Sequence, residues 1–199
     1  MERKTQDQRS AETMARVLEV AERHFATHGY DATSTESLVA DAGLTRGALY
    51  HHFGSKRGLF EAVVGAVQER LAQVVADQTR MDDPWEALRV GSRAWLGAAT
   101  DSAVQRILLL DAPSVLGWER WLALDEGGGG RLLQEGVAAE MGEGSLEPPL
   151  SLDSAALAQL LNGALNGLAL WVAAAEDREA ALVAANKALE RVLQGLRKS

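Results

Sequence analysis

Cysteine is absent from this 199-residue sequence. Its absence excludes disulfides, thiolate metal sites and a cysteine nucleophile, and it is consistent with a reducing compartment. A secretory signal peptide is also missing, because residues 1–20 mix acidic and basic side chains without an apolar centre. We therefore expect a cytoplasmic protein.

Motifs for catalysis are lacking as well. The sequence contains no P-loop, no dinucleotide-binding glycine pattern and no H-E-x-x-H helix, and polar residues such as Arg93 and Arg106 are scattered. His24 and His28 have the spacing of two metal ligands on a helix, but no neighbouring carboxylate or cysteine motif completes a site. We predict no enzyme activity, no cofactor and no metal site.

Strand patterns are the third absence, since no stretch alternates polar and apolar residues between hairpin turns. Apolar residues instead recur at intervals of three and four, which predicts amphipathic helices. With 47% hydrophobic and 24% charged residues, the chain can bury one or two cores. The expected fold is all-α, with about nine helices.

Charge is divided unevenly along the chain, whose formal net charge is −8. Residues 1–60 hold eight basic and eight acidic side chains, which leaves 12 basic and 20 acidic side chains for the remainder. The pattern indicates a neutral head on an acidic body. A head of this kind can still bind phosphates through a few well-placed cations.

The head is predicted from its capping residues. Gly29 is suited to end the first helix, either Thr33 or Ser34 can cap the second, and Thr45 and Ser55 can cap the third and fourth. The expected helices cover about residues 8–28, 34–42, 46–52 and 55–79. The two short helices with a tight turn between them have the layout of a helix-turn-helix, in a head over residues 1–56 that the fourth helix links to a body over residues 57–199.

The body shows the same helical period with three interruptions. Asp111-Ala-Pro113 is expected to close one helix, Gly127–Gly130 to form a bend or mobile joint, and Gly142–Leu150 to form a loop. The expected helices cover about residues 84–99, 104–110, 114–124, 131–141, 152–175 and 178–197.

The segment Ala155–Ala175 is apolar on nearly all sides and long enough to cross a membrane. Gln159, Asn162 and Asn166 interrupt it, and its flanks are acidic, which argues against a membrane span. We favour a helix buried on two sides, with one side against its own subunit and the other in a four-helix bundle with a second copy.

The head contains a set of residues at fixed spacing: Phe25-x-x-x-Gly29-Tyr30, Thr33, Ala42-Gly43, Gly47, Leu49-Tyr50, His52-Phe53, Lys56 and Leu59. This set resembles the TetR family of bacterial transcriptional regulators over about residues 10–65. Leu38-Val39 departs mildly from the Ile-Ala pair that is commoner in the family. The body carries no family-wide motif, although residues 110–118 look like a sequence shared by one TetR subgroup. The resemblance implies a DNA-binding domain over residues 1–56 and a ligand-binding and dimerisation domain over residues 57–199.

The resemblance implies a homodimer that binds a palindromic double-stranded DNA operator and releases it when a small molecule enters the body. In a helix-turn-helix, the start of the second helix points at base edges, and an arginine there can bond guanine in bidentate fashion. Helix N-termini supply phosphate contacts. The predicted DNA-binding residues are Thr33, Ser34, Thr35, Thr45, Arg46, Gly47, Tyr50, His51 and Lys56.

Two of these side chains have more than one candidate role. The ring of Tyr50 could pack under its helix and offer only its hydroxyl to DNA, and both arrangements remain open. His51 and His52 are adjacent, so they point to different faces of a helix, which favours one DNA-facing and one structural histidine over a metal pair.

Candidate residues in the body follow from aromatic content and helix faces. Tryptophans could line a pocket for an apolar or aromatic ligand, although plain core packing explains each of them equally well. The expected pocket residues are Trp85, Trp95, Trp118, Trp121 and Asp111. The expected dimer interface comprises Leu157, Leu160, Gly163, Gly167, Trp171, Leu182, Leu189 and Val192.

These observations predict a dimeric DNA-binding transcriptional regulator, and a ligand-relieved repressor in particular. A regulator acting as an activator is the nearest competing hypothesis. Two more distant hypotheses are an all-α carrier or enzyme that binds no operator, and an interaction protein that dimerises without binding specific DNA.

Overall fold

The structure is a computed structural model that describes residues 6–142 and 153–197, and no β-strand occurs among them. The all-α prediction is confirmed. The helices are α1 Gln6–Ala32, α2 Thr35–Ala42, α3 Arg46–Phe53, α4 Lys56–Gln78, α5 Pro84–Ala99, α6 Ser102–Val104, the π-helix η1 Gln105–Asp111, α7 Ala112–Leu116, α8 Trp118–Glu126, α9 Gly129–Gly142, α10 Ser154–Ala173 and α11 Arg178–Leu196.

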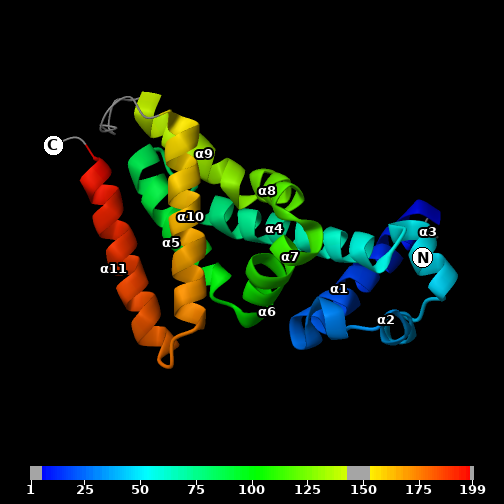
Figure 1. The fold of residues 1–199 in the computed structure, drawn as a ribbon. Coiled ribbons are helices and arrows are strands. Elements are labelled where there is room, and N and C mark those ends of the chain that lie inside the picture. Colours follow the sequence, from blue (N-terminus) through cyan, green and yellow to red (C-terminus); the bar gives the residue numbers. More distant parts are fainter. Residues whose placement is uncertain (1–5, 143–152, 198–199) are drawn as a thin grey trace, which may run out of the picture.

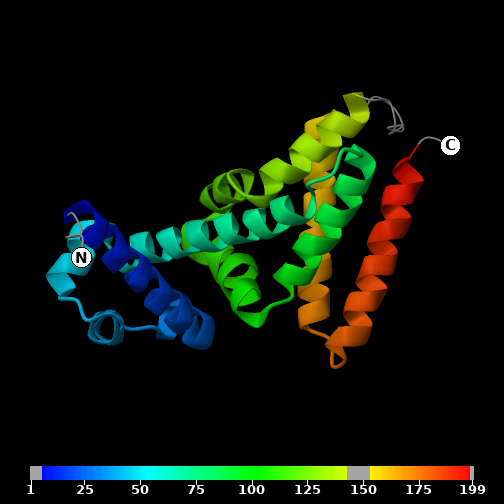
Figure 2. The same ribbon diagram turned by 180° about the vertical axis from the view of Figure 1, so that it is seen from behind.

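The helices form a small head at one end and a larger body at the other (Figure 1). Helices α1, α2 and α3 make up the head, and the long helix α4 runs from the head into the body. Helices α10 and α11 lie side by side at the end of the body farthest from the head, as the reverse view also shows (Figure 2).

Local capping explains why the head helices begin where they do. The side chain of Ser34 accepts a hydrogen bond from the backbone N–H of Ser37, and Thr45 and Ser55 cap α3 and α4 in the same way. These bonds satisfy backbone donors that a helix leaves unpaired at its start. Gly29 adopts φ 78° and interrupts α1 as expected. Of the two candidate caps for α2, Ser34 is therefore the one used.

An aromatic cluster joins the head to α4. The Phe25 and Phe60 rings meet edge to face with their centroids 4.9 Å apart, and the Tyr30 ring lies 5.0 Å from Phe60. Phe25 and Phe60 are fully buried. Such pairs add stabilisation to that of apolar burial, so the start of α4 is held firmly against α1.

Two polar contacts fasten the head to the body. The backbone N–H of Tyr30 donates to the Asp111 carboxylate at 2.8 Å. From the start of α4, the Arg57 guanidinium donates to the carbonyls of Val115 at 3.1 Å and Leu116 at 2.9 Å. Asp111 lies at the end of η1, so the head is attached to η1 and α7 as well as to α4.

The prediction that Asp111-Ala-Pro113 closes a helix was wrong. Helix α6 continues through η1 and α7 as far as Leu116, because Asp111 and Ala112 before Pro113 keep helical backbone angles. The break comes at Gly117, whose φ of 82° suits glycine. A single helix over residues 114–124 was therefore also wrong.

The glycine run is partly helical rather than a joint of four residues. Helix α9 begins at Gly129, two residues earlier than expected. A Cβ on Gly129 would lie 2.9 Å from Trp95 Nε1, and one on Gly130 would lie 2.8 Å from Asp125 Oδ2. Close packing of α9 on α5 and α8 therefore requires these glycines despite their low helix propensity. The expected loop after Gly142 lies outside the described residues.

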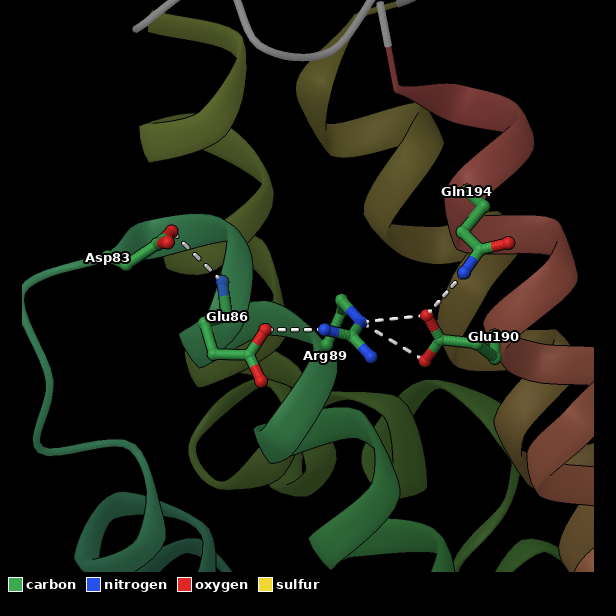
Figure 3. A network of polar contacts seen from close by, with 5 residues as sticks. All are labelled: Asp83, Glu86, Arg89, Glu190 and Gln194. Carbon is green, nitrogen blue, oxygen red and sulfur yellow. Dashed lines mark hydrogen bonds and ion pairs between the residues drawn. The ribbon is translucent and has the colours of Figure 1, made fainter.

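Helix α11 is held to α5 by an ion-pair network (Figure 3). Arg89 Nε donates to Glu190 Oε1 at 2.8 Å and Oε2 at 3.1 Å, and its guanidinium also binds Glu86. Gln194 donates to Glu190 from the next turn of α11. The Arg89 and Glu190 side chains are 25% and 23% exposed, so solvent screens this pair less than a surface pair.

Helix α10 passes a length and composition test for membrane spanning, with mean hydropathy 1.3 over a segment that is 39% buried inside the protein. Its buried residues pack on α5, α9 and α11. A core helix with one uncovered side has these same properties, and the covering of that side by a second copy stays a prediction.

A buried polar network connects three helices of the body. Gln68 on α4 donates to Asp125 Oδ1 at 3.1 Å, and Asn162 on α10 donates to Asp125 Oδ2 at 2.6 Å. Asp125 is only 2% exposed, and no basic side chain of the described residues pairs with it. Burial raises the pKa of Asp125, and the hydrogen bonds from Asn162 and Gln68 only partly oppose that shift.

Replacing Asp125 with asparagine is expected to stabilise the fold at neutral pH and to flatten its pH dependence. Because the native pKa lies above the unfolded value, the native state retains the proton between these two values, and stability falls as pH rises through that window. The free energy of unfolding lost in this way is about 1.4 kcal/mol for each tenfold difference in proton affinity between the two states. Urea unfolding between pH 4 and 7 measures it.

The matched control for this substitution is Glu119→Gln, which removes the same charge from an exposed side chain on the same helix α8. We expect its stability curve to keep the wild-type slope. A fall in stability with rising pH that is equally steep in Asp125→Asn and in the wild type would contradict the assignment to Asp125.

Candidate nucleic-acid interface

Helices α2 and α3 form a pair of eight-residue helices joined by a tight turn. Gly43 ends α2 in the left-handed conformation with φ 64°, and Thr45 begins α3 two residues later. Leu38, Ala42 and Leu49 are buried and hold the pair against the rest of the head. The opposite face of α3 is exposed, which is the arrangement of a helix-turn-helix.

Arg46 lies on this exposed face at the first position of α3. Its guanidinium donates to Glu36 at 3.0 Å and to the Tyr50 hydroxyl at 3.5 Å, and its side chain is 62% exposed. The Tyr50 hydrogen bond is the main reason that the pKa of Arg46 is raised, with smaller electrostatic contributions from Tyr50 and Glu36. The exposed guanidinium is therefore held by two neighbouring side chains.

Tyr50 is 36% exposed, and its ring lies below the Arg46 guanidinium, with 5.5 Å between the guanidinium carbon and the ring centroid. The arrangement with the ring buried beneath the helix is not the one in the structure. His51 and His52 are both exposed, with ring centroids 5.3 Å apart. Gly47 is exposed too, so backbone is accessible beside Arg46.

Thr33 does not lie on this surface. Its side chain is 2% exposed, and its hydroxyl donates to the carbonyls of Gly29 at 2.7 Å and His24 at 3.2 Å. It closes the break in α1 and cannot present its hydroxyl to DNA, so its assignment as a contact residue needs correction. Ser34 is exposed, and Thr35 is half-buried at the start of α2.

Lys56 already has internal partners. Its ammonium lies 3.4 Å from the Asp31 carbonyl and 4.4 Å from the centroid of the Tyr30 ring. Cation–π contact and the hydrogen bond place this charge at the N-terminus of α4, which also carries a partial positive charge. The side chain is half-buried, so it contributes to the structure of the head as well as to its surface charge.

The five expected pocket residues are not brought together. A cavity of about 220 Å³ lies between α4, α5, α9 and α10, and Trp95 is the only one of the five that lines it. Trp118 is 64% exposed on α8. Trp121 donates to the Leu108 carbonyl at 2.8 Å, and Asp111 is the partner of Tyr30.

Trp85 is the remaining member of that set. It is buried to 6% exposure, and the Arg197 guanidinium lies over its ring at 5.2 Å. Trp85 therefore packs α5 against the end of α11. Ser92 and Asn162 also line the cavity but were not predicted as pocket residues, although each interrupts an otherwise apolar helix face, as was already noted for Asn162.

The expected interface residues divide into three groups by their exposure. Leu157 and Leu189 are each 2% exposed and belong to the core of the chain itself, so their assignment to an interface needs correction. Leu182 is half-buried. The uncovered members, Leu160, Trp171 and Val192, are 62%, 52% and 49% exposed, and Gly163 and Gly167 lie open between them.

A metal centre is not among the features of the described residues, which contain no group of three or more His, Asp or Glu side chains arranged to hold an ion. His24 pairs with Asp41 at 2.7 Å and its ring lies 5.9 Å from that of His28. The pair on α1 thus has a carboxylate nearby, supplied by α2, but it does not complete a site.

The fold and its exposed helix-turn-helix define a DNA-binding transcriptional regulator with an all-α body. Two family models match the chain: "Bacterial regulatory proteins, tetR family" over residues 17–63 and "Tetracyclin repressor-like, C-terminal domain" over residues 85–196. The second alone spans more than half of the sequence. The chain belongs to the TetR family.

A TetR-family transcriptional regulator from Pectobacterium atrosepticum is similar along its whole length. It is 36% identical, with 98% of this chain and 99% of that chain covered and a TM-score of 0.77. This likeness extends to the body, where the sequence carries no motif of the whole family.

Among curated relatives, the transcriptional repressor AcnR from Corynebacterium glutamicum is 43% identical over 61 residues, which is 31% of this chain and 32% of AcnR. The repressor BepR from Brucella suis is 31% identical over 75 residues, or 38% of this chain and 36% of BepR. The similarity thus spans about a third of the length of these relatives, and the family is one of regulators rather than enzymes.

Proposed function

We propose that this protein is a ligand-relieved repressor that binds a palindromic operator as a homodimer. The observation that carries the proposal is the exposed start of α3, where Thr45, Arg46 and Gly47 project from a helix-turn-helix whose core is fully packed. Relatives matched over the head are repressors, which favours repression over activation.

In this proposal Arg46 reads guanine, because its guanidinium is exposed and can donate two parallel hydrogen bonds to O6 and N7. Thr45, Tyr50 and His51 contact neighbouring bases or phosphates from the same face. Ser34, Thr35 and Lys56 supply phosphate contacts together with the N-termini of α2 and α4. Thr33 positions this surface from beneath.

The dimer is proposed to form through α10 and α11, whose outward face carries large exposed apolar side chains. A contiguous apolar patch of this kind on a water-soluble surface marks an interaction site. A side chain added at Gly163 or Gly167 would meet no atom within 4 Å, so a second backbone can approach closely there. A two-fold axis through this face produces a four-helix bundle.

Replacing Leu160 with aspartate is expected to convert the dimer to a monomer, because the change buries a charge at the proposed interface at a cost of several kcal/mol. Size-exclusion chromatography with light scattering measures the mass. The matched control is Leu110→Asp, since Leu110 is 52% exposed on η1 and does not belong to the proposed interface. A wild-type chain that elutes as a monomer would overturn the dimer itself.

Regulation is proposed to work through the spacing of the two heads. A helix-turn-helix dimer must place its recognition helices about 34 to 36 Å apart to reach successive major grooves. An effector in the body lowers operator affinity only if it binds better to a geometry with a different spacing. Helix α4 is the element that both lines the cavity and carries the head.

Selection of binding sites from random duplex DNA tests the proposal. We expect an inverted repeat whose half-sites are one helical turn apart. If the protein bound at this repeat increases rather than blocks transcription in a reconstituted promoter assay, the result would favour an activator. Enrichment of no sequence at all, with a well-folded protein, would refute the regulator and leave a carrier, an enzyme or an interaction protein.

A further inference from the structure

The size of the body cavity limits what can occupy it. Its volume is about 220 Å³, and it lies between the end of α4 and helices α5, α9 and α10. A dry cavity of about 150 Å³ holds one benzene molecule. The additional room suits a few more non-hydrogen atoms, so a ligand that fits wholly inside is about the size of a benzene ring with one or two small substituents.

The walls of the cavity are mostly apolar. The aliphatic side chains come from all four helices, and the Trp95 ring lies among them. Apolar walls favour an occupant that is itself largely apolar, because the transfer of its surface out of water drives binding. The apolar lining residues are Val75, Ala87, Leu88, Trp95, Leu132, Leu133 and Leu165.

Four uncharged polar side chains also line the cavity, on Thr79, Ser92, Trp95 and Asn162, and the Thr79 hydroxyl already donates to the Val75 carbonyl at 3.0 Å. The Ser92 hydroxyl can donate and accept, and the Trp95 indole N–H can donate. The Asn162 amide nitrogen is engaged with Asp125, while its oxygen has only a long contact of 3.4 Å from Asn166. The cavity therefore offers both donors and acceptors to a ligand.

Charge is confined to the edge of the cavity. Glu135 is its only ionisable lining residue among the described ones, and the carboxylate is 59% exposed and paired with Arg131 at 2.7 Å. The described lining residues offer no buried charge that could pair with an ionic ligand, and burial of an unpaired charge is costly. The acidic body disfavours anions further.

We propose that this cavity is the effector site and that its ligand is a small uncharged molecule, a single substituted ring with one hydroxyl or carbonyl group directed at Ser92 and Asn162. The role of this ligand as an effector rests on the proposed function. The predicted class of ligand rests only on the size and lining of the cavity.

The position of Asn162 gives the ligand a route to the head. Asn162 shares the Asp125 carboxylate with Gln68, which lies on α4 two turns before Val75. Val75 and Thr79 at the end of the same helix line the cavity directly. A ligand that hydrogen-bonds to the Asn162 amide thus changes contacts of α4 at two places, at Gln68 through Asp125 and at Val75 and Thr79 directly.

Isothermal titration calorimetry of the full chain with neutral probes tests the proposal. The probes are phenol, 4-ethylphenol and 4-propylphenol, with 4-ethylbenzoate as an anion of similar shape. We expect one neutral probe per chain to bind at least tenfold more tightly than the anion. Equal affinity for 4-ethylphenol and 4-ethylbenzoate, or no binding of any neutral probe, would overturn the ligand class.

Two variants locate the binding site. Gly136 lines the cavity, and a Cβ there would lie 3.5 Å from Leu88, so Gly136→Leu is expected to fill the space and abolish binding. Gly97→Leu is the control, since Gly97 is exposed on α5 and a Cβ there would have no atom within 4 Å. Equal affinity in the two variants would place the ligand elsewhere.

Ser92→Ala separates hydrogen bonding from cavity filling, because the change is small enough to preserve the fold. It is expected to weaken 4-ethylphenol by about fivefold or more and to leave ethylbenzene unchanged. Binding to the selected operator is measured separately, with and without 4-ethylphenol. A failure of the regulator proposal appears as absence of a selected operator, whereas a failure of this inference appears in the titrations alone.

Discussion

Replacing Gly58 with alanine is expected to weaken operator binding by about 3 kcal/mol or more, roughly 100-fold, through the loss of two or more base contacts. A Cβ at this position would lie 2.1 Å from the carbonyl oxygen of Phe53. Phe53 is the last residue of α3, and Gly58 lies in the first turn of α4. The two backbones must separate to admit a methyl group, which tilts α3 away from its position on the head.

The control for this substitution lies two turns further along the same helix. Gly65→Ala adds the same methyl group where no atom lies within 4 Å, and alanine there gains about 1 kcal/mol of helix propensity. Electrophoretic titration of the selected operator measures both variants, and circular dichroism shows whether the body stays folded. Operator affinities of Gly58→Ala and Gly65→Ala within threefold of each other would contradict the packing argument.

Replacing Arg46 with alanine is expected to cost about 1–3 kcal/mol on the operator, or roughly 5- to 150-fold, with little effect on random DNA. Arg46 is exposed and held outward by Glu36 and Tyr50, so it is oriented before DNA arrives. By contrast, Lys56→Ala is expected to weaken all sequences similarly and to reduce the salt slope by about one.

The ion pair with Glu36 requires a control of its own. Loss of Arg46 leaves the Glu36 carboxylate without its partner near the proposed phosphate path, and repulsion alone could weaken binding. The double variant Glu36→Gln with Arg46→Ala removes that repulsion. Base reading by Arg46 predicts that the preference for operator over random DNA stays low in the double variant, and a return of the preference would refute it.

Much of the head could be predicted because its signals are local. Ser34, Thr45 and Ser55 cap helices through bonds to residues three positions away, and Gly29 and Gly43 end helices through their own backbone angles. Such features need no knowledge of distant parts of the chain. Together with the spacing of the family residues, they were sufficient for the class of protein.

Errors arose where contacts made only in the folded structure, at sequence separations from 4 to 81 positions, decide the outcome. Thr33 follows the pattern of an exposed contact residue, yet its hydroxyl is used by carbonyls of α1. Gly129 and Gly130 were predicted to form a joint, yet they lie in helix α9, where Trp95 and Asp125 pack too closely to leave room for a side chain. Asp111 was predicted to line a pocket, yet its carboxylate accepts a hydrogen bond from the backbone N–H of Tyr30, 81 positions away in the sequence.

The sequence by itself determined the all-α class, the helix-turn-helix and membership of a family, because helix periods, caps and short motifs act over a few residues. Only the tertiary structure decided which tryptophan lines the cavity, which face of α10 remains uncovered and how Asn162, Asp125 and Gln68 meet. Those relations join residues tens of positions apart, and they depend on how whole helices pack rather than on the residues beside them in the chain.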